Sequence, residues 1–194
     1  MPPVLPFRRT RIASSKFEDL LRPHVEHLYR LAWRFTGSVA DAEDLVQDVL
    51  LKLFPRAQEL SDIEQLRPWL VRVLYHQYID LMRQKERSPS VGPTPNSEDG
   101  VNPLDELPSV QDGPEEHAER GQRYERILWA LDQLNPDQRA VVAMHDIEGY
   151  NLEELETILE TPLGTLKSRL HRARGRLREL LAMEPFSAAE RVRE

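Results

Sequence analysis

Six lysine and arginine side chains fall between Lys167 and Arg178 with no acid among them, in a 194-residue chain whose formal net charge is −7. Cations clustered on one helix can neutralise DNA phosphates, and their side chains can donate to base edges in the major groove. The same residues could instead form a solvated basic face paired with the acids Glu153, Glu154 and Glu156. The elements around the run decide between the two interpretations.

Those elements have the pattern of a helix-turn-helix. Asn151 and Glu154 form a start signal for a short helix over residues 152–160, and Thr161-Pro162 opens a longer helix after a tight turn. A short helix, a turn and a longer basic helix is the arrangement that places a recognition helix in the major groove. The pattern therefore favours DNA contact over a solvated basic face.

The apolar residues of the longer helix share one side, which we expect to pack on the preceding helices. They are Leu166, Leu170, Ala173 and Leu177. The opposite side and its two flanks are expected to meet bases and phosphates. The candidate DNA-binding residues are Thr165, Lys167, Ser168, Arg169, His171, Arg172, Arg174 and Arg176. Gly164 would let the backbone approach a phosphate at the helix N-terminus. The acids elsewhere in the chain should discourage non-specific DNA binding.

A second set of candidate residues is acidic and lies on the exposed face of a helix that Ser38 caps and Pro55 ends. The set consists of Asp41, Asp44, Gln47 and Asp48. Such a face can dock on a cationic partner or remain solvated. A Mg²⁺ site is disfavoured because no second carboxylate cluster, phosphate loop or nucleophile accompanies it. His24 and His27 lack a third ligand, so we predict no metal, no cofactor and no catalytic residue.

Helical periodicity on both sides of one acidic segment predicts an all-α protein of two small helical domains joined by a flexible acidic linker. Residues 88–118 hold six of the fifteen prolines and no Lys or Arg, a composition that cannot bury enough apolar surface to fold. The predicted segments are an N-terminal tail over 1–15, a domain over 16–87, the linker over 88–118, a domain over 119–183 and a C-terminal tail over 184–194.

Within the first domain we expect a helix from about Phe17 that Pro23 restarts or kinks and Gly37 ends, then the acidic helix, a polar loop and a third helix from Pro68 to about Arg87. The expected core face of the third helix is Trp69, Leu70, Val73, Leu74 and Leu81. In the second domain, helices are expected over about 119–134 and 136–148, ahead of the short and long helices.

Composition excludes several classes of protein. The chain has no cysteine, which removes disulfides and thiolate zinc sites. Its start has no apolar stretch long enough for a signal peptide, and no apolar run approaches the ~20 residues of a membrane helix. We expect a cytoplasmic protein.

Several stretches closely resemble extracytoplasmic-function (group IV) sigma factors of the sigma-70 family. "LNPDQRAVVAMHDIEGY" and "TPLGTLKSRLHRARGRLREL" resemble their C-terminal DNA-binding domain. "LYRLAWRFTGSVADAEDLVQDVLLKLF" and "LRPWLVRVLYHQYIDLMRQ" resemble their N-terminal sigma-two domain. The "DAEDLVQD" stretch, in this order relative to the helix-turn-helix, makes the match specific.

The resemblance implies an alternative sigma factor that binds core RNA polymerase through the β′ clamp helices and the β flap. It gives the acidic face of Asp41, Asp44, Gln47 and Asp48 the role of docking on the clamp helices. It implies that the last helix reads the minus-35 element in double-stranded promoter DNA. The first domain would melt the minus-ten element, through the loop over 55–65 and the third helix. The residues expected there are Arg67, Tyr75, His76, Tyr78 and Arg83. An anti-sigma factor is a further implied partner.

The chain departs from the family pattern at four positions. His76 replaces a common Asn and Tyr75 the preceding Arg, which leaves the minus-ten sequence open. Glu156 stands where a small residue is common and Glu160 where Gly is common, so Glu156 is expected to tilt outward or to alter the helix packing. The alternative function is a helix-turn-helix regulator that does not engage polymerase, although it leaves "DAEDLVQD" unexplained.

Overall fold

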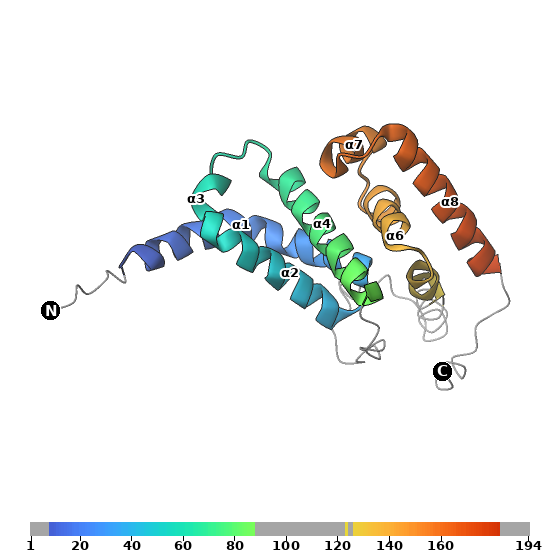
Figure 1. Ribbon diagram of the computed structural model, residues 1–194, viewed down its shortest axis with the longest axis horizontal. Coiled ribbons are helices and arrows are strands. Elements are labelled where there is room, and N and C mark those ends of the chain that lie inside the picture. The colour runs from blue at the N-terminus through green and yellow to red at the C-terminus, as the bar shows by residue number, and fades with distance from the viewer. Residues whose placement is uncertain (1–7, 88–122, 124–125, 183–194) are drawn as a thin grey trace, which may run out of the picture. The chain divides into compact units, whose positions relative to one another are not determined.

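The structure, a computed structural model, describes residues 8–87, 123 and 126–182, with side chains described from Lys16 onward. All regular structure in these residues is helical, which confirms the all-α class (Figure 1). Contacts divide the chain into two compact units, Met1–Asn96 and Ser97–Glu194, as expected for two helical domains. The predicted linker and C-terminal tail lie outside the described residues. None of the described helices is long and apolar enough to span a membrane.

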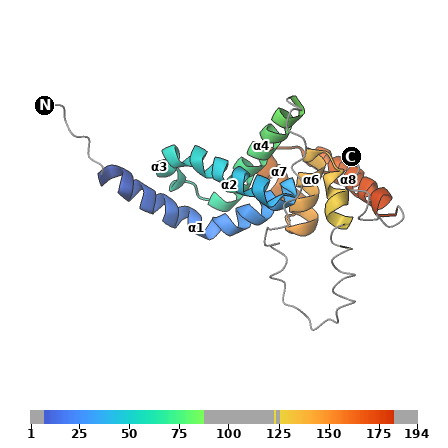
Figure 2. The same cartoon turned by 90° about the horizontal axis from the view of Figure 1, so that it is seen from below.

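In the first unit, α1 (Arg8–Thr36) runs beside α2 (Val39–Leu53), and α4 (Leu66–Arg87) packs on both (Figures 1 and 2). Their apolar faces form one core, in which the stacked rings of Phe35 and Tyr78 have centroids 5.0 Å apart. Its largest fully buried side chains are Leu21, Leu28, Leu31, Phe35, Leu45, Leu60, Leu70, Leu74 and Tyr78. Burying each of these stabilises the unit by roughly 1.5–3 kcal/mol.

α1 starts earlier than predicted and does not restart at Pro23, although Figure 2 shows the helix bending along its length. It begins at Arg8, inside the segment expected to be a tail, and continues through Pro23. Pro23 is exposed, so the backbone carbonyl that its missing N–H leaves unpaired can bond to water. Gly37 ends the helix as predicted: its φ is 74°, and its N–H donates to the Trp33 carbonyl at 2.7 Å.

The start of α2 is capped by Ser38, whose hydroxyl accepts a hydrogen bond from the Asp41 backbone N–H at 3.3 Å. The predicted apolar stripe is buried at Ala42, Leu45, Val46, Val49 and Leu53, whereas Leu50 is only half-buried. The segment expected to be a loop after Pro55 is partly helical. It contains the 3-10 turn η1 (Phe54–Arg56) and the short α3 (Ala57–Leu60), which Leu60 anchors in the core.

The predicted core face of α4 is shifted around the helix. Leu70 and Leu74 are buried as expected, but Trp69, Val73 and Leu81 are only half-buried. The remaining buried positions of α4 are Val71, Tyr75, Tyr78 and Ile79. α4 packs on both α1 and α2, so its buried surface is wider than one stripe.

The second unit consists of a helical stretch over residues 126–132, α6 (Pro136–Val142), η2 (Ala143–Ile147), α7 (Leu152–Leu159) and α8 (Leu163–Ala182). Asn135 caps α6, accepting a hydrogen bond from the Gln138 backbone N–H at 2.9 Å. η2 is a single π-helical turn that continues α6, and the Glu148 N–H donates to the Ala143 carbonyl at 3.0 Å. The fully buried Met144, Leu155 and Leu166 join the elements in one core.

Candidate nucleic-acid interface and partner-binding face

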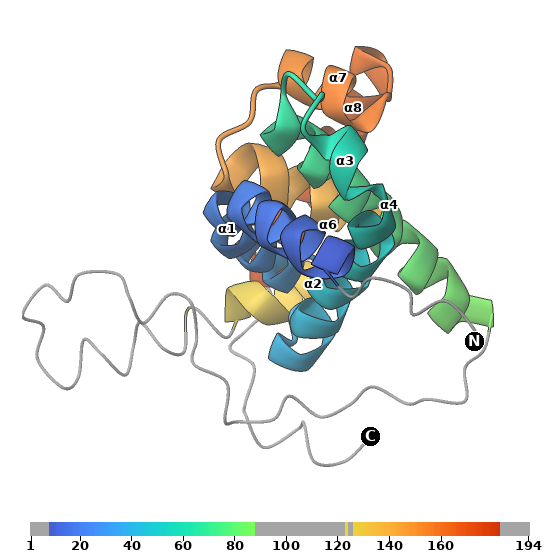
Figure 3. The ribbon, with the colours of Figure 1, turned by 90° about the vertical axis from the view of Figure 1, so that its left-hand side faces the viewer.

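α7 and α8 lie side by side and form the predicted helix-turn-helix (Figures 1 and 3). The capping box at the start of α7 is complete: Asn151 accepts from the Glu154 N–H, and Glu154 accepts from the Asn151 N–H, both at 2.8 Å. α7 ends at Glu160, which has a left-handed φ of 49°. A glycine reaches that conformation without strain, so the turn geometry explains why Gly is expected there.

Glu156 tilts outward, as one of the two outcomes expected for it, and bonds across the turn. Its Oε1 accepts a hydrogen bond from the Leu163 backbone N–H at 2.8 Å. The Leu163 N–H is one of the first amides of α8, which have no partner within the helix. Glu156 therefore caps the recognition helix with a carboxylate, which the positive end of the helix dipole favours.

One side of α8 is buried at Leu166, Leu170, Ala173 and Leu180. The opposite side is exposed at Lys167, Ser168, His171 and Arg172, and Thr165 is half-buried beside it. Arg172 folds back along the helix and donates to the Ser168 carbonyl at 3.2 Å. Arg176 pairs with Glu179 one turn on, at 3.3 Å. A Cβ added at Gly164 would meet no atom within 4 Å, so the domain itself does not require glycine there.

Arg169 and Arg174, both expected to touch DNA, are held by aspartates of the preceding helical segment. Arg169 pairs with Asp137 of α6 at 3.1 Å. Arg174 pairs with Asp146 of η2 through both nitrogens of a bidentate contact, with Nε to Oδ2 at 3.0 Å. The hydrogen bonds that Arg174 donates to Asp146, and the negative charge of Asp146, raise the pKa of Arg174 above its usual value. These long-range pairs were not predicted from the sequence.

The acidic face of α2 is exposed at Asp44, Gln47 and Asp48. Within the described residues, the carboxylates of Asp44 and Asp48 make no ion pair. Asp41 differs from them, because Lys85 at the end of α4 pairs with its carboxylate at 3.0 Å. Leu51 follows on the same helix and is 64% exposed, so an apolar side chain adjoins the acidic ones.

Two of the five residues expected to contact the minus-ten element are core residues. Tyr75 is 5% exposed and Tyr78 is 2% exposed, so neither ring can stack on a base; the face of α4 that carries them packs on the other helices. The remaining three, Arg67, His76 and Arg83, are exposed. Trp69, which we assigned to the core, is only half-buried, and it follows Arg67 by two residues in the sequence.

His27 of α1 is a buried histidine next to Arg67. Its Nδ1 lies 3.4 Å from Nη2 of Arg67, and its side chain is 6% exposed. Burial, with the positive charges of Arg67, Arg30 and Arg34, lowers the pKa of His27 from 6.5 to about 4. At neutral pH the imidazole is therefore neutral, which suits a buried position among arginines. The described residues, His24 and His27 among them, hold no cluster of three or more His, Asp or Glu side chains that could bind a metal.

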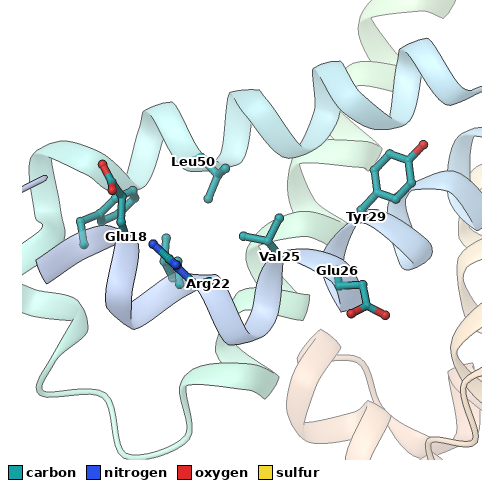
Figure 4. Close-up of a pocket in the computed structure, with 8 residues that line it drawn as sticks. Glu18, Arg22, Val25, Glu26, Tyr29 and Leu50 are labelled. Atoms are coloured by element: carbon teal, nitrogen blue, oxygen red, sulfur yellow. The ribbon is translucent and has the colours of Figure 1, made fainter. Parts of the chain in front are cut away.

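A pocket of about 600 Å³ opens between α1 and α2 (Figure 4). Its apolar lining includes Val25 and the half-buried Leu50, which explains why Leu50 leaves the predicted core stripe. Charged and polar side chains also line it. The full lining is Phe17, Glu18, Leu21, Arg22, Val25, Glu26, Tyr29 and Leu50. Sequence reasoning did not find this pocket, because it depends on the spacing between two helices.

Comparison with known proteins matches both units. Residues 20–88 match the family model of sigma-70 region 2, and residues 124–177 match that of sigma-70 region 4. The ECF RNA polymerase sigma factor SigE of Mycolicibacterium smegmatis is 33% identical over 92% of this chain and 66% of its own length. The RNA polymerase sigma-E factor of Streptomyces avermitilis is 31% identical over 92% of each chain. The first unit thus corresponds to sigma-70 region 2 and the second unit to sigma-70 region 4.

The solved structure of the sigma factor RpoE in complex with the anti-sigma factor NepR from Bartonella quintana is also similar. It aligns with a TM-score of 0.62 and 27% identity, over 87% of this chain and 98% of that chain. The structure of CnrH in complex with the cytosolic domain of CnrY has the same fold, with a TM-score of 0.55 at 20% identity.

Proposed function

We propose, because the chain belongs to the extracytoplasmic-function group of the sigma-70 family, that it binds core RNA polymerase and directs transcription initiation at specific promoters. The polymerase carries out the chemistry, and this chain supplies no catalytic group. The observation that carries the proposal is the pairing of two features in one chain: a capped helix-turn-helix with an exposed polar face, and an acidic helix face in the other unit.

In this proposal α8 reads the minus-35 element of double-stranded promoter DNA. Ser168, His171 and Arg172 carry donors and acceptors on the exposed face and are placed to reach base edges. Lys167 lies on a flank, where a cation meets a phosphate rather than a base. Thr165, near the helix N-terminus, and Arg176, one turn beyond Arg172, complete the contact surface. Arg169 and Arg174 have a different role, which is argued below.

The acidic face of α2 is the proposed docking surface for the β′ clamp helices. The carboxylates of Asp44 and Asp48, which are exposed and make no ion pair within the described residues, steer a cationic partner and set its register. Gln47 adds a neutral donor and acceptor between them. Asp41 contributes less than we expected from the sequence, because Lys85 already neutralises it. The β flap is the proposed partner of the second unit, although no residue is assigned to that contact.

The first unit is also proposed to capture the melted minus-ten strand. Arg67, His76 and Arg83 are the exposed candidates on α4, and cations on the same helix as the exposed His76 ring suit a single strand. Tyr75 and Tyr78 support α4 from the core. An anti-sigma factor is the proposed regulator, because the similar RpoE was solved in complex with one. A regulator that does not engage polymerase is not favoured, since it gives region 2 no role.

Run-off transcription with purified core polymerase and a pool of promoter fragments tests the proposal. Initiation from a discrete subset of fragments is the expected result. The double variant Asp44→Lys/Asp48→Lys should abolish transcription while binding to minus-35 duplex is retained. The control is Asp19→Lys, which reverses an exposed charge of the same unit on α1 rather than on α2. Transcription that survives reversal at Asp44 and Asp48 would exclude the proposed docking face.

A further inference from the structure

Three anion-binding groups of α8 are each occupied by a carboxylate of the same domain. The Leu163 N–H at the helix start donates to Glu156 at 2.8 Å. Arg169 pairs with Asp137 at 3.1 Å, and Arg174 pairs with Asp146 at 3.0 Å. Asp137, Asp146 and Glu156 are here named the carboxylate collar. They come from three different elements, α6, η2 and α7.

Each group held by the collar is a kind that commonly binds phosphate. A helix N-terminus presents unpaired amides and the positive end of the helix dipole to an anion. An arginine guanidinium binds carboxylate and phosphate with the same forked geometry. A DNA phosphate that approached these groups would therefore have to displace a carboxylate that is already bonded.

The collar holds α8 on both sides of its exposed face. Arg169 and Arg174 are five residues apart, so at 3.6 residues per turn they lie on opposite flanks. Asp146 lies in η2, and π turns of this kind are frequent at functional sites. Among the described residues of α8, Lys167, Arg172 and Arg178 make no ion pair with an acid, whereas Arg169, Arg174 and Arg176 each do. The helix therefore offers fewer free cations to DNA than its sequence contains.

We propose that the carboxylate collar is a specificity determinant of the recognition helix. By withholding Arg169, Arg174 and the α8 N-terminus from phosphates, it lowers the sequence-independent part of DNA affinity. Binding then depends more strongly on the residues that reach base edges. Phosphate contacts supply most of non-specific affinity, so removing them from α8 raises the ratio of promoter binding to bulk DNA binding. The inference rests on the proposed DNA contact by α8.

The test neutralises each collar residue while keeping an oxygen at the same position. Asp137→Asn removes the charge that pairs with Arg169. Asp146→Asn and Glu156→Gln remove the charge but keep an oxygen that can accept from the same donor, so the domain should still fold. Glu153→Gln is the matched control, because Glu153 is exposed on α7 and makes no ion pair within the described residues. The full-length variants are titrated with a duplex of random sequence and with a minus-35 duplex, at several salt concentrations, by fluorescence anisotropy.

Asp137→Asn and Asp146→Asn should each bind random duplex about tenfold more tightly at low salt. Each should steepen the slope of log K against log salt concentration by about 0.9, the value for one added phosphate contact. Glu156→Gln should raise affinity with little change in slope, because the group it releases is an amide rather than a cation. Adding Arg174→Gln to Asp146→Asn should abolish the gain.

The proposal would be overturned if Asp137→Asn and Asp146→Asn had the same salt slope as Glu153→Gln. A general effect of the lost negative charge would then explain any gain in DNA affinity. Weaker DNA binding by folded variants would also overturn the proposal and make the three acids structural supports only. Thermal unfolding checks folding, and if one variant does not fold, the other two decide. Absence of duplex binding by the wild-type protein and every variant at low salt would instead exclude the proposed DNA contact itself.

Discussion

On α2 the carboxylates of Asp44 and Asp48 are exposed and, within the described residues, have no ion-pair partner. On α8 the guanidinium groups of Arg169 and Arg174 form ion pairs with aspartates of their own domain. Both faces carry the charge that their proposed partners require, negative for the clamp helices and positive for DNA. They differ in whether the domain has already neutralised that charge.

This difference between the two faces corresponds to the number of competing binding sites that each face meets. A protein docking face meets one specific surface, so exposed charge speeds the encounter and orients it. A DNA-reading helix meets a genome of non-specific sites, so unrestricted positive charge increases binding to all of them. Internal ion pairs on α8, and their absence at Asp44 and Asp48, fit these two requirements.

The largest expected effect is on the exposed face. Asp44→Lys/Asp48→Lys should weaken binding to core polymerase about 100-fold, because like charges placed opposite each other cost several kcal/mol. Asp41→Asn should weaken it only about twofold, since an exposed pair such as Asp41–Lys85 has little remaining charge to offer. Equilibrium binding of labelled protein to core polymerase measures both. If Asp41→Asn weakened binding to core polymerase equally, pairing with Lys85 would not reduce the contribution of a carboxylate to docking.

The comparison also marks how far sequence reasoning reached. Helix caps are local signals, and Ser38 and Asn151 each accept a backbone hydrogen bond at the helix start predicted for them. The all-α class and two helical domains followed from periodicity. Three of the four candidate residues on α2 and most of those on α8 are exposed, because an amphipathic pattern fixes which side is buried once one stripe is clear.

The features that could not be predicted from the sequence depend on contacts between distant elements. Arg174 and Asp146 are 28 residues apart, and nothing local pairs them. α4 has apolar residues around much of its circumference, so periodicity could not show that Tyr75 and Tyr78 face inward while Trp69 does not. Glu156 was recognised as unusual for its position, but its bond to Leu163 required the turn geometry. The π turn at η2 has no reliable sequence signal.

The second prediction concerns how the stability of the first unit depends on pH. The unit carrying α2 buries the neutral His27, whose pKa of about 4 is lower than the unfolded value of 6.5. The unfolded state therefore binds the proton first as pH falls. The stabilising contribution of His27 is complete above pH 6.5 and is lost between 6.5 and 4, amounting to about 2 kcal/mol by pH 5.

Urea unfolding followed by the fluorescence of Trp33 and Trp69 in a Trp129→Phe background measures the stability of this unit alone. The free energy of unfolding should fall between pH 6.5 and 5, and His27→Gln should flatten that part of the profile. A wild-type profile that is already flat over this range would show that His27 does not titrate as the structure indicates.

The third prediction compares two cations on one flank of α8. Lys167 has no acid partner in the described part of the chain, whereas Arg174 is paired with Asp146. Lys167→Gln should weaken binding to minus-35 duplex about fivefold and reduce the salt slope by about 0.9. Arg174→Gln should cause a smaller loss on both measures. Fluorescence anisotropy at several salt concentrations gives both quantities, and equal losses would contradict the assignment of Arg174 to the collar.

The smallest expected effects come from the turns that precede the two charged helices. Gly37 before α2 and Glu160 before α8 both have a positive φ, 74° and 49°. Gly37→Ala should destabilise the first unit by about 1 kcal/mol, because alanine is strained in the left-handed region. Glu160→Gly should stabilise the second unit by about 0.5 kcal/mol, since relief of strain exceeds the entropy that glycine loses on folding.

Thermal unfolding measures both substitutions, with shifts of a few degrees in opposite directions. Glu160→Gly should leave DNA affinity unchanged, because the collar contacts on α6, η2 and α7, rather than the turn, hold α8 in place. A change in the salt slope of DNA binding on Glu160→Gly would show that the strained turn itself helps to orient α8. The ion pairs of Arg169 and Arg174 would then not be the sole reason that these cations are withheld from DNA.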